Sequence, residues 1–150
     1  LAEGAEPLIE LAAKKQLHAL VVFTQDLTEL FGAARVSEAA RQLELLVFVG
    51  TNANPTAALA HVALPSAVYA EQEGTFTNFQ GRGQRLRAAL APWGEAKPEW
   101  DIVNALASRL GLSVAFVDAQ TTFAELAKSE KPFQGLTYQT IGDQGAMLKE

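Results

Sequence analysis

Hydrophobic residues in the first part of the chain gather in short runs separated by polar segments. Ala19–Phe23 and Leu45–Gly50 are continuous apolar runs rich in β-branched side chains, and His61–Leu64 is a shorter run of the same kind. Runs of this length and composition are typical of strands buried on both faces. The pattern therefore predicts three strands of a parallel sheet.

Segments with helical periodicity or capping residues lie around these runs. Pro7–Leu17 alternates apolar and polar positions at helical spacing. Asp26 or Thr28 can cap a helix after the first strand, and Ser37–Leu43 continues in helical register with its serine as a cap. Pro55–Leu59 suits a short helix that begins with proline. Alternation of strand and helix predicts an α/β fold of Rossmann-like, parallel-sheet type with right-handed crossovers.

The second part of the chain shows one strong helix among weaker signals. Ala70–Gly83 has no dominant period and predicts an ordered loop, whereas Gln84–Pro92 alternates as a strand does. Pro98–Gly111 has acidic residues in its first turn, an apolar stripe and a terminal glycine, which together predict a helix. Thr122–Lys128 begins with a capping-box pattern. Phe133–Glu150 has no clear period and predicts a loop or docking segment.

Composition limits the chemistry that these residues can perform. The chain has 150 residues, 49% of them hydrophobic, with no cysteine and two histidines. Disulfides, thiolate zinc sites, a cysteine nucleophile and cysteine-bound iron–sulfur clusters are therefore excluded within it. No Gly-x-Ser-x-Gly, Walker or His-Glu-x-x-His motif occurs. We predict no catalytic residue and no metal ligand in this chain.

The net charge, the lengths of the apolar runs and the first residue limit the partners that we expect and indicate the origin of the chain. A formal net charge of -5 argues against nucleic acid as the main partner. No apolar run is long enough to cross a bilayer, so we expect no direct membrane insertion. The chain begins with Leu1 rather than methionine, from which we expect a fragment or processed product of a longer polypeptide.

Polar residues follow each predicted strand, at Thr24–Asp26, Gly50–Pro55 and Pro65–Glu73. Ligands of open parallel sheets bind at the carboxyl ends of the strands, so these segments are candidate site positions. The third segment leads into a stretch of small, polar and basic residues. Its members are Gly74, Thr75, Thr77, Asn78, Gly81, Arg82, Arg85 and Arg87. Such a stretch suits close approach of the backbone to a polar ligand or a buried partner.

Several polar residues favour structural roles over chemistry. The three arginines can clamp a phosphate or carboxylate, but surface or inter-domain ion pairs are the favoured interpretation. We expect His18 and His61 to be hydrogen-bonded structural residues. Glu71 and Glu73 can share a proton on a strand, although solvated loop carboxylates are the favoured interpretation.

The stretch 61–85 resembles a signature of the molybdopterin oxidoreductase superfamily. That signature runs Ala-Asp-Val-Val-Leu-Pro and then Glu-x-x-Gly-Thr-(Phe/Tyr)-x-Asn-x-Glu-Gly-Arg-x-Gln. The matching positions are Ala60, Val62, Leu64, Pro65, Glu71, Gly74, Thr75, Phe76, Asn78, Gly81, Arg82 and Gln84. Gly50 with Asn54 and Pro55 is similar to the family's strand-end Gly-x-Asn-Pro, and Trp100–Gly111 to its following helix.

Two branches of this superfamily are consistent with these motifs. In molybdenum enzymes such as formate dehydrogenases, the corresponding α/β domain helps to hold a bis-pterin guanine dinucleotide. The large iron–sulfur (G-type) subunit of NADH:quinone oxidoreductase, complex I, keeps the fold without the molybdenum centre. Gln80 in place of the usual Glu, His61 in place of Asp, and the short chain after Gly111 favour complex I. The tail after Phe133 also resembles complex I subunit endings.

The complex I resemblance is our leading hypothesis for function. It implies a scaffold segment, itself not catalytic, of an enzyme that transfers electrons from NADH to quinone. Residues 1–111 would be the α/β domain segment of the formate dehydrogenase/DMSO reductase type, and 112–150 an extension packed on it or on neighbours. No cofactor is expected within the segment, and iron–sulfur clusters are expected elsewhere in the full-length chain. The partners would be other subunits of the peripheral arm, on the cytoplasmic face of the inner membrane.

Two alternatives remain open. A molybdopterin-dependent oxidoreductase, similar to formate dehydrogenase, would contact molybdopterin guanine dinucleotide. The resemblance assigns this contact to Thr75, Asn78, Gly81 and Arg82. The second alternative is an isolated Rossmann-like domain whose loop 50–55 binds a nucleotide.

Overall fold

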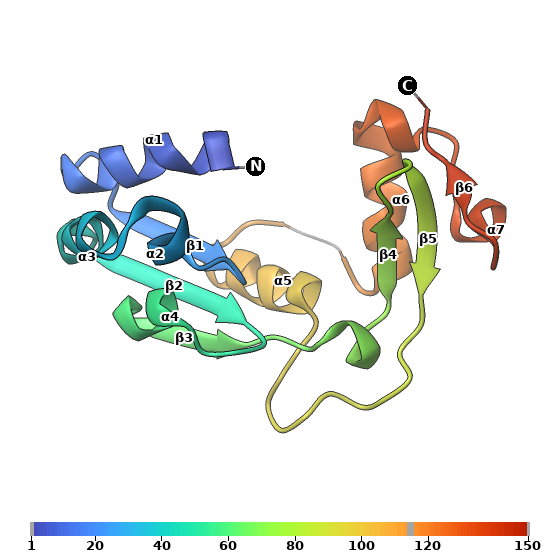
Figure 1. Cartoon of the computed structure of the whole chain (residues 1–150). Helices are drawn as coiled ribbons and strands as arrows, with labels where there is room; N and C mark the ends of the chain where they lie inside the picture. Colours follow the sequence, from blue (N-terminus) through green and yellow to red (C-terminus); the bar gives the residue numbers. More distant parts are fainter. Residues whose placement is uncertain (1, 114–115, 150) are drawn as a thin grey trace. The chain divides into compact units, whose positions relative to one another are not determined.

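The computed structural model describes residues 2–113 and 116–149, so the chain ends and residues 114–115 of the predicted extension lie outside the described residues (Figure 1). The chain forms two compact units, Leu1–Ser66 and Ala67–Glu150. The domain boundary predicted after Gly111 came from a family resemblance. It is a different kind of division from these two units, and it stays a prediction.

The first unit contains a three-stranded parallel sheet (Figure 1). Its strands are β1 (Ala19–Phe23), β2 (Leu45–Gly50) and β3 (Val62–Pro65), in the order β1-β2-β3. Ala19 pairs with Leu45, and Val47 pairs with Val62. The parallel α/β prediction is therefore confirmed, with each of the three apolar runs forming a strand.

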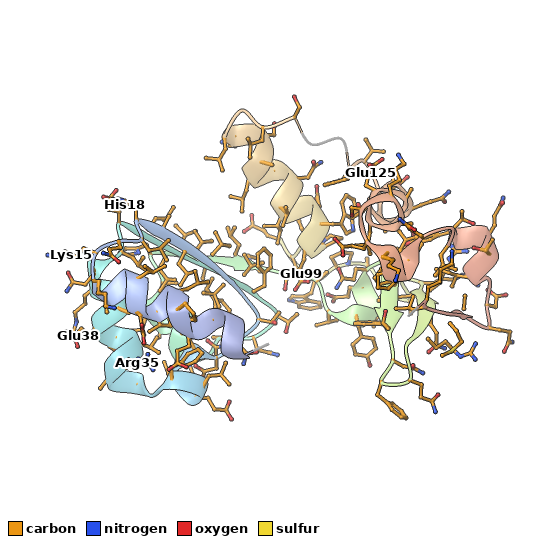
Figure 2. All side chains as sticks on the ribbon, turned by 90° about the horizontal axis from the view of Figure 1, so that it is seen from above. Lys15, His18, Arg35, Glu38, Glu99 and Glu125 are labelled. Carbon is orange, nitrogen blue, oxygen red and sulfur yellow. The ribbon has the colours of Figure 1, made fainter. Side chains whose placement is uncertain are left out.

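Four helices accompany this sheet among the described residues of the first unit: α1 (Ala2–Ala13), α2 (Leu27–Phe31), α3 (Ala33–Gln42) and α4 (Pro55–Leu59). Helix α3 packs against α1 and α2. Arg35 on α3 also forms ion pairs with Glu6 at 2.8 Å and Glu10 at 3.4 Å on α1 (Figure 2). The buried core comprises Ile9, Ala12, Val22, Leu27, Val36, Ala39, Ala40, Leu43, Leu46 and Phe48.

Several helix boundaries in this unit differ from the prediction, and α1 begins at Ala2 and not at Pro7, which lies inside the helix. Helix α1 ends at Ala13 and not at Leu17, because Lys15 adopts a left-handed conformation (φ +58°) and the Gln16 N–H donates back to the Leu11 carbonyl. Helix α3 begins at Ala33 after Gly32, whose φ is +84°. Ser37 therefore lies inside α3 and is not its cap.

The second unit contains an antiparallel sheet, of which the sequence predicted only strand-like structure at Gln84–Pro92. Strands β4 (Gly74–Thr77) and β5 (Arg82–Leu86) form a hairpin, and β6 (Ala146–Met147) pairs with the other edge of β5. The tail, predicted as a loop or docking segment, thus contributes a strand that pairs with β5. Ala146 pairs with Gly83 and Met147 with Arg82, far away in the sequence, and no local pattern in a two-residue strand reveals such a pairing.

The helices of the second unit are α5 (Glu99–Arg109), α6 (Ala119–Ser129) and α7 (Tyr138–Ile141), with 3₁₀ turns at Tyr69–Glu71 and Lys131–Phe133. Helix α5 confirms the strongest helix prediction. Helix α6 begins at Ala119, earlier than the predicted Thr122, because Asp118 accepts the Thr121 N–H at 2.7 Å as its N-cap. A small core joins Ala119, Phe123, Ala127, Tyr138 and Ile141.

Candidate functional site

A cavity of about 280 Å³ lies at the carboxyl ends of β2 and β3. It is lined by Phe48, Gly50, Thr51, Asn52, Ala53, Ala57, Ala63, Leu64 and Pro65. Parallel strands end at the same edge of a sheet, where such folds bind ligands. Two of the three strand-end segments singled out in the sequence therefore meet at one cavity.

The loop between β2 and α4 forms the polar mouth of this cavity. Thr51 and Asn52 are exposed, and the Asn52 Nδ2 donates to the Thr51 Oγ1 at 3.3 Å. Asn54 then caps α4 by accepting the Ala57 N–H at 2.8 Å, and Pro55 occupies the first turn as predicted. The side chains of Thr51 and Asn52 can therefore offer hydroxyl and amide groups to a ligand.

The strand-end segment Thr24–Asp26, which follows β1, is linked to α4 by hydrogen bonds of Asp26. Asp26 caps α2, accepting the Thr28 N–H at 2.9 Å and the Thr28 hydroxyl at 2.7 Å. Its Oδ1 also accepts the buried Thr56 hydroxyl at 2.9 Å. The Thr28 hydroxyl is the main group that lowers the pKa of Asp26 below its ordinary value, and Thr56 adds to this. Asp26 is therefore held as a carboxylate.

The four residues assigned to the pterin by resemblance lie on the β4–β5 hairpin. The Asn78 Oδ1 accepts the N–H groups of Gln80 and Arg82, each at 3.0 Å. Gly81 has φ +78° and donates its N–H to the Asn78 carbonyl. Asn78 and Gly81 thus build the turn itself, while Thr75 pairs with Arg85 within the hairpin. A contact of these residues with a pterin stays a prediction.

The three arginines all reach the C-terminal segment of the same unit. Arg82 donates to the Gln144 and Gly145 carbonyls, both at 3.4 Å. Arg85 lies over the Tyr138 ring, 4.5 Å from its centroid, and Arg87 forms an ion pair with Asp143 at 2.6 Å. The structure therefore confirms an ion pair for Arg87, and it gives the other two different contacts.

The histidines and glutamates occupy structural positions. The Leu46 N–H donates to the His61 Nδ1 at 2.8 Å, which joins β2 to the start of β3. His18 hydrogen-bonds Glu44 at 2.8 Å at the amino ends of β1 and β2, the opposite end of the sheet from the cavity (Figure 2). Glu71 accepts the Val68 N–H, and Glu73 is exposed.

Residues 2–113 and 116–149 contain neither a metal-binding cluster nor a membrane-spanning helix. No group of three histidine, aspartate or glutamate side chains in this part of the chain is placed to hold a metal ion. No helix there is long and apolar enough to cross a bilayer.

Comparison with known proteins identifies relatives for most of the chain. The sequence model of the molybdopterin oxidoreductase family matches residues 3–109. The F420-dependent formate dehydrogenase 2 subunit alpha of Methanococcus maripaludis is 38% identical over 112 residues, which are 73% of this chain and 17% of that protein. A putative formate dehydrogenase of Staphylococcus aureus is 32% identical over 127 residues, 84% of this chain and 13% of that protein.

Two further comparisons extend this picture. The NADPH-Fe(3+) oxidoreductase subunit alpha of Geobacter sulfurreducens is 45% identical over 76 residues, 51% of this chain and 9% of that protein. Acetylene hydratase from Pelobacter acetylenicus has the same fold, with a TM-score of 0.72 at 22% identity over 95% of this chain and 20% of that one. The chain spans less than a fifth of the length of each curated relative named here.

Proposed function

Because this chain belongs to the molybdopterin oxidoreductase family, we propose that it is the α/β part of a molybdopterin-dependent oxidoreductase that acts on formate. The observation that carries the proposal is the similarity to formate dehydrogenase subunits over 73% and 84% of the chain. Their names describe whole proteins that are several times longer. Activity, substrate and partners are therefore proposed for the whole protein and not for these 150 residues alone.

The cavity at the strand ends fits one part of a pterin dinucleotide. Its volume of about 280 Å³ is at the lower end of small-molecule sites, so it can accept one moiety of such a cofactor and not the whole. Gly50 allows the Phe48 ring to form one wall, while Thr51 and Asn52 offer polar groups at the mouth. These three residues would hold that moiety.

The four hairpin residues assigned by resemblance are a second candidate set for contacts with the cofactor. They fit this role less directly than the cavity residues do. Asn78 uses its side-chain oxygen within the turn, whereas the Arg82 guanidinium makes long contacts of 3.4 Å with the carbonyl groups of Gln144 and Gly145. Arg82 is therefore the member of the predicted set with the greater freedom to bind a phosphate or a pterin edge. When bound, the cofactor would supply two-electron chemistry at its metal.

A role in complex I has less support. The curated relatives named above are other oxidoreductases. The short length after Gly111 does not argue for complex I, because this chain spans only 17% of one of these relatives. His61 serves the sheet through its bond with Leu46, and Gln80 is exposed near the hairpin tip. His61, one of the departures that favoured complex I, thus has a structural role in the sheet. Clusters elsewhere, complex I partners and an inner-membrane location stay predictions.

Formate oxidation by the whole purified protein tests the proposal. Under anaerobic conditions, formate gives carbon dioxide, one proton and two electrons, which an added viologen dye accepts. We expect formate-dependent dye reduction. NADH-dependent reduction of a quinone analogue, without formate activity, would favour complex I instead. Binding of guanosine monophosphate to the 150-residue chain, in a protein without pterin, would favour the isolated nucleotide-binding domain.

A further inference from the structure

Two very short helices flank the loops at the carboxyl end of the parallel sheet. Helices α2 (Leu27–Phe31) and α4 (Pro55–Leu59) have five residues each. Helices of this length do not persist on their own, because nucleation costs more than so few hydrogen bonds return. Their positions therefore depend on caps and on contacts with the rest of the unit.

Thr56 provides such a contact between the two helices. Its side chain is fully buried (0% exposed). The hydroxyl donates to the Asp26 Oδ1 at 2.9 Å and accepts the Leu27 N–H at 2.8 Å. One hydroxyl thereby satisfies both the N-cap residue of α2 and the first backbone N–H of that helix. Breaking it would leave a buried N–H without this partner.

The residues next to Thr56 on both sides line the cavity. Thr51, Asn52 and Ala53 precede α4 through its cap Asn54, and Ala57 follows Thr56 directly. A shift of the first turn of α4 would therefore move the polar mouth of the cavity. The neighbouring Thr28 also bonds Asp26 but, within the described residues, makes no hydrogen bond to α4, so the two threonines can be separated by experiment.

We propose that Thr56 is a positioning residue, whose hydroxyl holds the loop 51–54 in the conformation that receives a moiety of the cofactor. The inference rests on the proposed function only in naming the ligand. The coupling between the loop and the Asp26 cap follows from the hydrogen bonds of Thr56 alone.

Hydrogen exchange of the 150-residue chain tests the coupling. Thr56→Val keeps the shape of the side chain and removes the hydroxyl. We expect it to speed exchange of the backbone amides of Ala57 and Ala58, which both donate to Asn54, by about tenfold or more. Thr56→Ser should restore slow exchange, and Thr28→Val, the matched control, should leave these amides unchanged. Equal exchange in wild type and Thr56→Val, or equal acceleration by Thr28→Val, would overturn the inference.

A second variant covers the case in which Thr56→Val does not fold. Asp26→Ala removes the acceptor of the Thr56 hydroxyl but leaves its bond with the Leu27 N–H. This variant should accelerate exchange of the Ala57 and Ala58 amides relative to the wild type. Exchange at the wild-type rate in this variant would likewise contradict the coupling.

Cofactor content of the whole protein tests the link to the ligand. Thr56→Val should lower the amount of pterin retained after gel filtration, and Thr56→Ser should retain the wild-type amount. Faster loop exchange with unchanged pterin content would overturn the positioning role while leaving the proposed function intact. Absence of pterin from the wild-type protein would instead refute the proposed function, whatever the exchange data show.

Discussion

The ring of Phe48 fills the space in which a side chain at Gly50 would stand. A Cβ atom at position 50 would lie 2.6 Å from Cε1 and 2.8 Å from Cζ of Phe48. Both residues line the strand-end cavity, and Phe48 is only 3% exposed. The glycine therefore allows the ring to pack beside the last residue of β2.

Gly50→Ala tests this packing. Because the buried ring must move, we expect the free energy of unfolding to fall by about 1–3 kcal/mol, as for other overpacked sites. Urea denaturation of the 150-residue chain measures the change. Gly4→Ala is the control, since a Cβ there meets nothing within 4 Å and the position is helical. Equal stability of the two variants would contradict the Phe48–Gly50 relationship.

The strands could be predicted because their information is local. Ala19–Phe23 and Leu45–Gly50 are apolar over their whole length, and both form strands with those bounds. Helix ends were harder, since they depend on single residues. The left-handed Lys15 ends α1 early, and Asp118 begins α6 early. A lysine carries no sequence signal for that conformation, whereas the Asp-x-x-Thr spacing at Asp118 was a signal that could have been used.

The candidate site also has features that could be predicted from the sequence and features that could not. Strand-end segments indicated the cavity because topology brings them together. The bond between Thr56 and Asp26 was not predicted, because it joins residues 30 positions apart. The same holds for the contacts of Arg82 and Arg85 with the tail, where the sequence gives no pairing rule.

Gly145→Ala should detach the tail strand from the hairpin. Gly145 has φ +75°, and a Cβ there would lie 2.7 Å from the Gly83 carbonyl oxygen. We expect faster exchange of the Leu148 amide, which donates to the Gly81 carbonyl at 2.8 Å. Gly111→Ala, at φ +73° with nothing within 4 Å of its Cβ, isolates the backbone strain. Unchanged protection at Leu148 in Gly145→Ala would count against the contact.

Alkaline pH should weaken the second unit through Tyr138. Burial raises the pKa of its phenol above the ordinary value, with the Arg85 charge acting against this. The unfolded chain therefore releases the proton first. Stability should be complete below about pH 10 and should decline as pH rises toward the folded-state pKa. Tyr138→Phe should remove this decline in pH-dependent urea denaturation, whereas Tyr69→Phe, at an exposed ring, should not. A decline that persists in Tyr138→Phe would refute the assignment.

Acid pH should weaken the first unit through Asp26. The hydroxyl of Thr28 lowers the Asp26 pKa most, so the folded chain holds this carboxylate below the pH at which the unfolded chain takes up the proton. The stabilisation should be complete above about pH 4 and lost as pH falls through the folded-state pKa. NMR titration of the carboxyl carbon gives the midpoint. Thr28→Val should raise that midpoint; a midpoint at or above the ordinary value in the wild type would be inconsistent with the network.

The cofactor content of the whole protein tests the central claim most directly. The protein that contains this chain should be purified under anaerobic conditions, with molybdenum and tungsten measured by mass spectrometry and pterin by the fluorescence of its oxidised form. Membership of a pterin-dependent enzyme predicts about one atom of molybdenum or tungsten per chain, together with pterin. A folded protein that contains neither metal nor pterin would contradict the account.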